Sequence, residues 1–135
     1  MDAVVGGSGS GYGDGSGYGY GEYWKACLAS FVGKLDSPSR ALASSLQSAG
    51  AKLAFWWSDK TGAPSNGGRD VAAKPRAVHT ASGPLTLCHA GTLHATLLPP
   101  RWKGERLWIV ALKGEVIGDD EKMGCLERVI IGECI

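Results

Sequence analysis

One cysteine and two histidines, Cys88, His89 and His94, lie close together near the middle of the chain. A cysteine thiol can act as a nucleophile when a histidine accepts its proton, and the same three side chains can bind a metal ion. Structural zinc requires four ligands at short spacing, and the sequence offers no second ligand pair beside these three. We therefore predict no metal and no cofactor, and we retain Cys88, His94 and His89 as candidate catalytic residues without assigned roles.

The residues around this group predict a strand, a tight turn and a second strand. Apolar and polar residues alternate at 85–87 and again at 93–97, which is the period of a half-buried strand. The turn is expected at residues 88–91, where Gly91 can adopt a positive φ. This arrangement favours a structural role, with Cys88 buried and His94 bonded to a neighbour on the second face of the sheet. Nucleophilic chemistry is the alternative, although the sequence reveals no device for stabilising an oxyanion.

A second group of candidate residues interleaves basic and aromatic side chains in the segment RWKGERLW, residues 101–108. Such segments are typical of nucleic-acid surfaces, because aromatic rings stack on bases while Lys and Arg hold phosphates. The segment is short and Glu105 offsets its charge, so a protein partner is favoured over nucleic acid. The candidate binding residues are Trp102, Arg101, Lys103 and Arg106, with Trp57 in a preceding strand and Asn66 and Arg69 in a long loop over residues 58–77.

Two helices are expected before these segments. Apolar residues at helical spacing from Trp24 to Leu35 predict a first helix over residues 22–35. A second helix is expected over residues 38–49, with Ser37 as its cap and Gly50 just beyond its end.

Strands are expected after the helices, at residues 52–57, 107–116 and 126–131 in addition to the central pair, and a turn is expected at residues 119–122. The stretch from Leu107 to Leu112 is apolar throughout, so its strand should be central in the sheet. Helices followed by strands favour an α+β fold. We predict a helical hairpin over residues 22–50 followed by a mainly antiparallel sheet of four to six strands over residues 51–135.

The N-terminal segment differs in composition from the rest. Residues 6–21 contain nine of the 21 glycines, alternating with Ser, Tyr and Asp. Such a segment has little to bury and loses much backbone entropy on ordering. Residues 1–21 are therefore predicted to be a flexible Gly/Tyr/Ser-rich tail, and residues 22–135 a single domain. In an alternative interpretation, Tyr12, Tyr18 and Tyr20 stack on one another, on a partner, or on the bases of single-stranded nucleic acid.

Composition and charge restrict the class of protein. The chain of 135 residues has a hydrophobic content of 44% and a formal net charge of +1, so there is no global attraction to nucleic acid or to acidic lipid. Its four cysteines, Cys27, Cys88, Cys125 and Cys134, include no CxxC motif. No signal peptide or membrane span is evident. We expect reduced thiols in a cytoplasmic protein without membrane association.

The pattern GPLxLCxxGxLHA at residues 83–95, followed by LWxVxLxGEV at residues 107–116, resembles a family of small uncharacterised proteins of bacteriophages and prophages. The similarity covers residues 78–133 best, and some members carry a Gly/Tyr/Asp-rich segment like residues 6–21. The resemblance implies a phage or prophage setting and a role in the cytoplasm of the host bacterium. It implies no activity.

The function expected from these observations is that of a non-enzymatic phage accessory protein that binds a host or phage macromolecule. A protein is the favoured partner. The first alternative is a small enzyme acting on a nucleotide or a protein side chain, with Cys88 and His94 at its site. The second is a virion-associated structural component. The oligomeric state and the identity of the partner are not encoded in any motif of the sequence.

Overall fold

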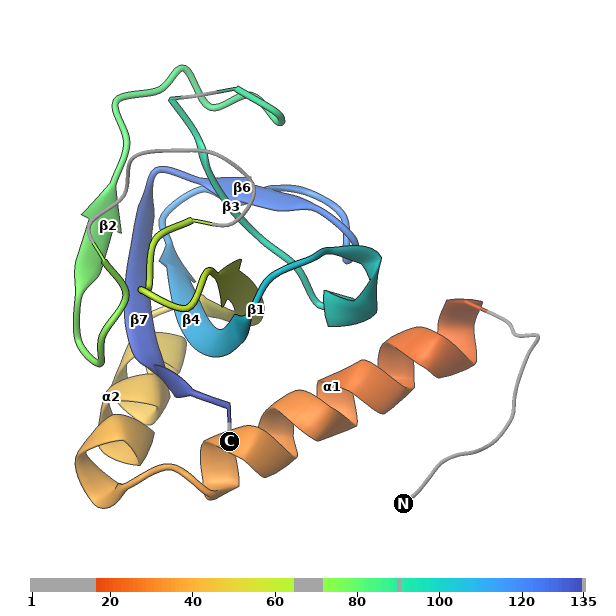
Figure 1. The fold of residues 1–135 in the computed structure, drawn as a ribbon, viewed down its shortest axis with the longest axis vertical. Helices are drawn as coiled ribbons and strands as arrows, with labels where there is room; N and C mark the ends of the chain where they lie inside the picture. Colours follow the sequence, from red (N-terminus) through yellow and green to blue (C-terminus); the bar gives the residue numbers. More distant parts are fainter. Residues whose placement is uncertain (1–16, 65–71, 90, 135) are drawn as a thin grey trace.

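The computed structural model describes residues 17–64, 72–89 and 91–134, and in these ranges two helices precede seven strands (Figure 1). The helices are α1 (Gly17–Gly33) and α2 (Ser37–Ser48). The strands are β1 (Lys52–Ser58), β2 (Val78–Thr80), β3 (Leu93–Ala95), β4 (Arg106–Lys113), β5 (Ile117–Gly118), β6 (Met123–Cys125) and β7 (Glu127–Glu133), and a 3-10 turn, η1 (Pro99–Arg101), precedes β4. The α+β fold with a helical hairpin ahead of antiparallel strands is confirmed.

The strands form two antiparallel sheets, one with the order β1-β4-β7-β2 and the other with the order β3-β6-β5. Backbone hydrogen bonds between Phe55 and Thr96, at 2.7 and 2.9 Å, join the edge of the first sheet to the residue that follows β3 of the second. Strand β4 lies between β1 and β7, as its apolar sequence predicted. It ends at Lys113, before the predicted end at Val116, because Gly114 turns the chain with a φ of +77°.

Both helices lie on the same side of the four-stranded sheet (Figure 1). Phe55 of β1 is fully buried there, with its ring edge-on to Trp24 and Phe31 of α1 at centroid distances of 6.0 and 6.2 Å. The apolar stripe that predicted the first helix is thus the stripe that covers the sheet. The helix begins at Gly17 rather than at Glu22, inside the segment predicted to be a tail, and residues 1–16 lie outside the described residues.

The second helix is capped by Asp36 and not by Ser37, which is already its first residue. The Asp36 carboxylate accepts a hydrogen bond from the backbone N–H of Ser39 at 2.8 Å. The same bond lowers the pKa of Asp36 below its usual value. Gly50 follows the C-cap Ala49 with a φ of +102°, as predicted, because a left-handed residue ends the helix at little steric cost in glycine.

The other face of the sheet buries an arginine. Arg128 of β7 is 1% exposed, and its guanidinium lies 4.2 Å from the ring centroid of Trp56 in β1. It donates to Nδ1 of the buried His79 in β2 at 2.8 Å and to the backbone oxygen of His94 in β3 at 2.6 Å. One side chain therefore bonds elements of both sheets, which positions β3 and His94 relative to the core.

The prediction of a hairpin around Cys88 is wrong for its first strand. Residues 85–87 form no strand, and β3 pairs with β6, with Leu93 opposite Cys125 and Ala95 opposite Met123. The side chain of Leu87 instead lies close to Gly118 and Gly124, where a Cβ would be 3.3 and 3.0 Å from its methyl groups. Leu87 thus packs against the small sheet from a loop, and its alternation with Leu85 does not come from strand pairing.

Candidate functional site

The residues of the predicted Cys/His site lie on a loop over residues 83–92, called the 83–92 loop, of which Ala90 is outside the described residues. Its ends are joined by a hydrogen bond from Gly83 N–H to Gly91 O at 2.8 Å. The Thr92 hydroxyl donates to Pro84 O at 2.9 Å and accepts from Thr86 N–H at 3.0 Å. A Cβ on Gly91 would overlap the carbonyl of Gly83, so glycine is required for the ends to approach this closely.

Cys88 is exposed on this loop, contrary to the prediction that it is buried. Leu85 and Leu87 are half-buried while Thr86, Cys88 and His89 are exposed, and Cys88 adopts a left-handed conformation with a φ of +62°. Its backbone N–H donates to His94 Nε2 at 3.0 Å. Cys88 and His94 are therefore close together, as the catalytic alternative required, but the histidine nitrogen binds the backbone of Cys88.

Both histidines of the candidate site accept hydrogen bonds from the loop backbone. Nε2 of His94 accepts from Cys88 N–H, and Nδ1 of the exposed His89 accepts from Gly91 N–H at 3.0 Å. A ring nitrogen that accepts such a bond carries no proton and has no lone pair left for a thiol proton. In this arrangement the histidines hold the shape of the 83–92 loop.

The side chain that contacts the Cys88 thiol is Lys122, which sequence reasoning did not select. Lys122 Nζ lies 2.5 Å from Cys88 Sγ, across 34 positions of sequence. Lys122 ends a turn that the sequence did predict at residues 119–122. There the Asp119 carboxylate accepts from the backbone N–H groups of Glu121 and Lys122 at 3.0 and 3.1 Å, which fixes where the lysine emerges.

Trp102 also contacts this lysine. Lys122 Nζ is 5.0 Å from the indole ring centroid, and the indole N–H donates to Glu121 O at 2.8 Å. Arg101 pairs with the Glu121 carboxylate at 3.4 Å, and both of these side chains are exposed. Part of the basic-aromatic segment therefore joins the Cys88 region, and we call Cys88, Arg101, Trp102, Glu121 and Lys122 the Cys88–Trp102 surface.

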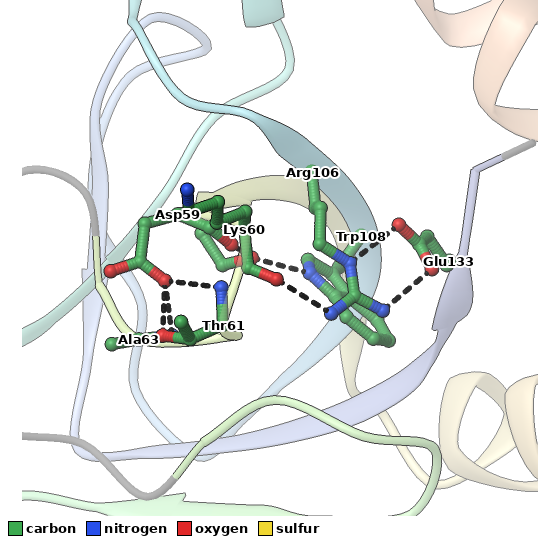
Figure 2. A network of polar contacts seen from close by, with 8 residues as sticks. Asp59, Lys60, Thr61, Ala63, Arg106, Trp108 and Glu133 are labelled. Carbon is green, nitrogen blue, oxygen red and sulfur yellow. Dashed lines mark hydrogen bonds and ion pairs between the residues drawn. The ribbon is translucent and has the colours of Figure 1, made fainter.

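Arg106, at the other end of the same segment, belongs to a separate network (Figure 2). Its guanidinium forms two hydrogen bonds to the Glu133 carboxylate, both of 2.8 Å, and lies 4.7 Å from the ring centroid of Trp108. Hydrogen bonding from Arg106 holds the pKa of Glu133 below its usual value, and the same bonds raise the pKa of Arg106. The Trp108 indole donates to the buried Ser58 hydroxyl at 2.9 Å. This network ties the ends of three strands together.

The other predicted binding residues are distributed differently. The Trp57 indole donates to Pro99 O at 2.9 Å, and a Cβ on Gly104 would lie 2.5 Å from Trp57 Cβ, so Trp57 supports η1 and the segment that carries Trp102. Lys103 is exposed. Asn66 and Arg69 lie outside the described residues. The segment at residues 101–108 thus contains side chains that the fold places in separate networks. The sequence also did not indicate that the turn at residues 119–122 lies beside Trp102.

The four cysteines are free thiols in different surroundings. Cys125 is fully buried and donates to Glu127 O at 3.4 Å. Burial, together with the nearby Glu133 carboxylate, raises the pKa of Cys134 to about 12. Cys27 is half-buried, so Cys88 is the one exposed thiol of the four.

Comparison of the chain with protein-family models, with curated proteins and with solved structures finds no match. In the described ranges, no three His, Cys, Asp or Glu side chains converge closely enough to share a metal ion. None of the helices in that part of the chain is long and apolar enough to cross a membrane. The phage-family resemblance therefore stays a prediction.

Proposed function

We propose that the protein is a non-enzymatic module that binds a partner protein through the Cys88–Trp102 surface. The observation that carries this proposal is the gathering of a half-buried tryptophan with charged groups of both signs, Arg101, Glu121 and Lys122, on two loops fixed by their own hydrogen bonds. Tryptophan and arginine are the side chains that contribute most often to protein–protein binding energy. Loops held by a rigid scaffold are also the usual carriers of recognition.

Nucleic acid is a weaker candidate for this surface. A base would have to stack on the indole of Trp102, whose ring already has the Lys122 ammonium over it. The two arginines of the segment, Arg101 and Arg106, are each paired with a glutamate. Phosphate binding would require those pairs to break, which lowers the affinity that the basic residues can supply.

The alternative of a small enzyme has one observation in its favour, the contact between Lys122 and the Cys88 thiol. The backbone N–H of Cys88, a common oxyanion donor beside a nucleophile, is bonded to His94 Nε2, and this bond occupies the Nε2 lone pair that would accept the thiol proton. A thiol-directed electrophilic substrate analogue that labels the protein with saturation kinetics, and fails to label Cys88→Ser, would favour the enzyme.

The biological setting is part of the proposal and rests on the sequence resemblance. A phage or prophage accessory protein would meet its partner, a host or phage protein, in the cytoplasm of the infected bacterium. A virion-associated component would instead remain with purified particles after infection.

The partner can be identified by capture on the full-length chain from extracts of infected bacteria, and then tested as a purified protein. The decisive variant reverses the Arg101–Glu121 pair as Arg101→Glu with Glu121→Arg. It preserves net charge and the intramolecular pair, but inverts the charges that a partner meets. The matched control reverses the exposed Lys113–Glu127 pair in the same way, at 3.2 Å on β4 and β7.

We expect the reversal at Arg101 and Glu121 to weaken binding of the purified partner at least about tenfold, because misplaced charges at an interface are costly. The control reversal should change affinity by less than about twofold. Equal affinity of both variants would refute the proposed surface. Capture that disappears on nuclease treatment would refute a protein partner.

A further inference from the structure

The contact between Cys88 and Lys122 places a thiol and an amine, which can combine when the sulfur is oxidised, in direct contact. Lys122 Nζ and Cys88 Sγ are 2.5 Å apart. We propose that this pair is a modification site, at which a peroxide produces a covalent sulfur–nitrogen link between the two side chains. The link needs no partner protein, and its formation can be tested whether or not the proposed binding function holds.

Both members of the pair are held in place by other contacts. The Cys88 backbone is fixed by its hydrogen bond to His94 Nε2, and Leu87 beside it lies close to Gly118 and Gly124 of the small sheet. Lys122 follows the turn closed by Asp119, and its ammonium lies over the indole of Trp102. The two reacting atoms therefore meet without a search by two flexible side chains, which favours reaction within the pair.

The chemistry takes place in two steps. The Cys88 thiol reduces a peroxide to an alcohol or water, and the sulfur becomes a sulfenic acid. Lys122, after one proton has passed to solvent, attacks that sulfur with its nitrogen lone pair. The sulfur–oxygen bond breaks, a sulfur–nitrogen bond forms and water leaves. The net change is the loss of two hydrogen atoms by the protein and the reduction of one peroxide. External thiols reverse it by attacking the sulfur.

The surroundings of the four thiols direct oxidation to Cys88. Cys88 is exposed, whereas Cys125 is fully buried and Cys27 is half-buried. Cys134, with its pKa raised to about 12, stays a thiol near neutral pH and reacts slowly with peroxides. Sulfenic acid formation follows exposure and thiolate character, so Cys88 should react first.

Formation of the link would alter the Cys88–Trp102 surface. The nitrogen of Lys122 loses its positive charge when it is bonded to sulfur, and the cation over the Trp102 ring is lost with it. The Cys88 thiol has already been lost in the preceding oxidation step. The modification therefore changes the charge presented beside Arg101 and Glu121 without any change in backbone pairing.

The experiment treats the folded full-length protein with a small excess of hydrogen peroxide and measures its intact mass and its proteolytic peptides. We expect a species lighter by the mass of two hydrogen atoms. Its peptides containing Cys88 and Lys122 should be joined, trypsin should not cut after Lys122, and dithiothreitol should restore the starting mass. The matched variant is Lys122→Arg, which keeps a cation over Trp102 and a similar length.

In Lys122→Arg, oxidation should stop at the sulfenic acid, which dimedone traps on Cys88. Cys88→Ser should show neither product, and both variants should melt within a few degrees of the wild type. An unchanged loss of two hydrogens in Lys122→Arg would reveal a disulfide and overturn the proposal. Trapping of sulfenic acid on Cys88 to the same extent in wild type and Lys122→Arg, or no oxidation of Cys88, would overturn it as well.

Discussion

Replacement of Arg128 by methionine tests whether the buried guanidinium holds the two sheets together. Methionine has a similar length and no donors, so Arg128→Met leaves Nδ1 of His79 and the backbone oxygen of His94 without the hydrogen bonds that Arg128 supplies. It also removes the cation 4.2 Å from the ring centroid of Trp56. Because Arg128 is 1% exposed, water cannot readily replace these contacts.

The expected loss follows from those three contacts. A hydrogen bond from a charged group contributes about 1.5–3 kcal/mol, and a desolvated cation–π contact about 2 kcal/mol. Methionine recovers part of this loss, because it removes the cost of burying a charge. We expect a net loss of about 3–5 kcal/mol, which is what remains of the about 5–8 kcal/mol of these three contacts after that recovery. For a domain of this size the thermal midpoint should fall by about 10–25 °C.

The assay is thermal unfolding followed by circular dichroism, with urea unfolding as a second measure of the free energy of unfolding. Arg128→Lys separates charge from shape: a lysine keeps the charge but cannot reach His79 and His94 together with a planar fork, so we expect a similar loss. The control is Arg40→Met, at an exposed arginine of α2, which should cost less than about 1 kcal/mol. A midpoint of Arg128→Met within about 3 °C of the wild type would refute the reasoning.

Three further predictions concern other parts of the molecule. Burial raises the pKa of Cys134 from 9.0 to about 12, so the contribution of this thiol to stability is complete below pH 9.0 and is lost as the pH rises through about 12. The difference in free energy of unfolding between wild type and Cys134→Ala should therefore shrink across that pH window. A constant difference would contradict this prediction. His94→Ala should lower the midpoint by several degrees, since it removes an acceptor worth about 1 kcal/mol, and should speed amide exchange at Cys88; unchanged exchange would exclude the bond. Deletion of residues 1–16 should move the midpoint by less than about 2 °C, whereas deletion of residues 1–21 also removes the start of α1 and should cost more; equal midpoints would mean that this first part of the helix adds no stability.

The elements that could be predicted are those whose signal is local. The helical spacing from Trp24 to Leu35 identified α1, although its start at Gly17 was missed because glycine disfavours helix. The run from Leu107 to Leu112 identified the central strand β4. The short strand β2 was not predicted, since three residues give no periodic signal and their pairing with β7 is decided by distant residues.

The site was predicted only in part for the same reason. The residue types of Cys88 and His94 singled them out, and their proximity follows from the short loop between them. Alternation of Leu85 and Leu87 pointed to a strand, but the same spacing arises in a loop in which both leucines are half-buried and Leu87 lies against the small sheet. Exposure of Cys88 could not be read from that pattern, because it depends on which face the loop presents.

The sequence by itself determined the order of helices and strands, the central position of β4 and the turn at residues 119–122, because apolar periodicity and turn chemistry act over a few residues. Only the tertiary structure decided that Lys122 meets Cys88 and Trp102, and that Arg128 is buried beside Trp56 and His79. These contacts join residues far apart in the chain, and arginine is ordinarily exposed, so no local rule predicts them. These contacts form because the two sheets meet at β1 and β3. This arrangement decides which polar side chains come within hydrogen-bonding distance of one another.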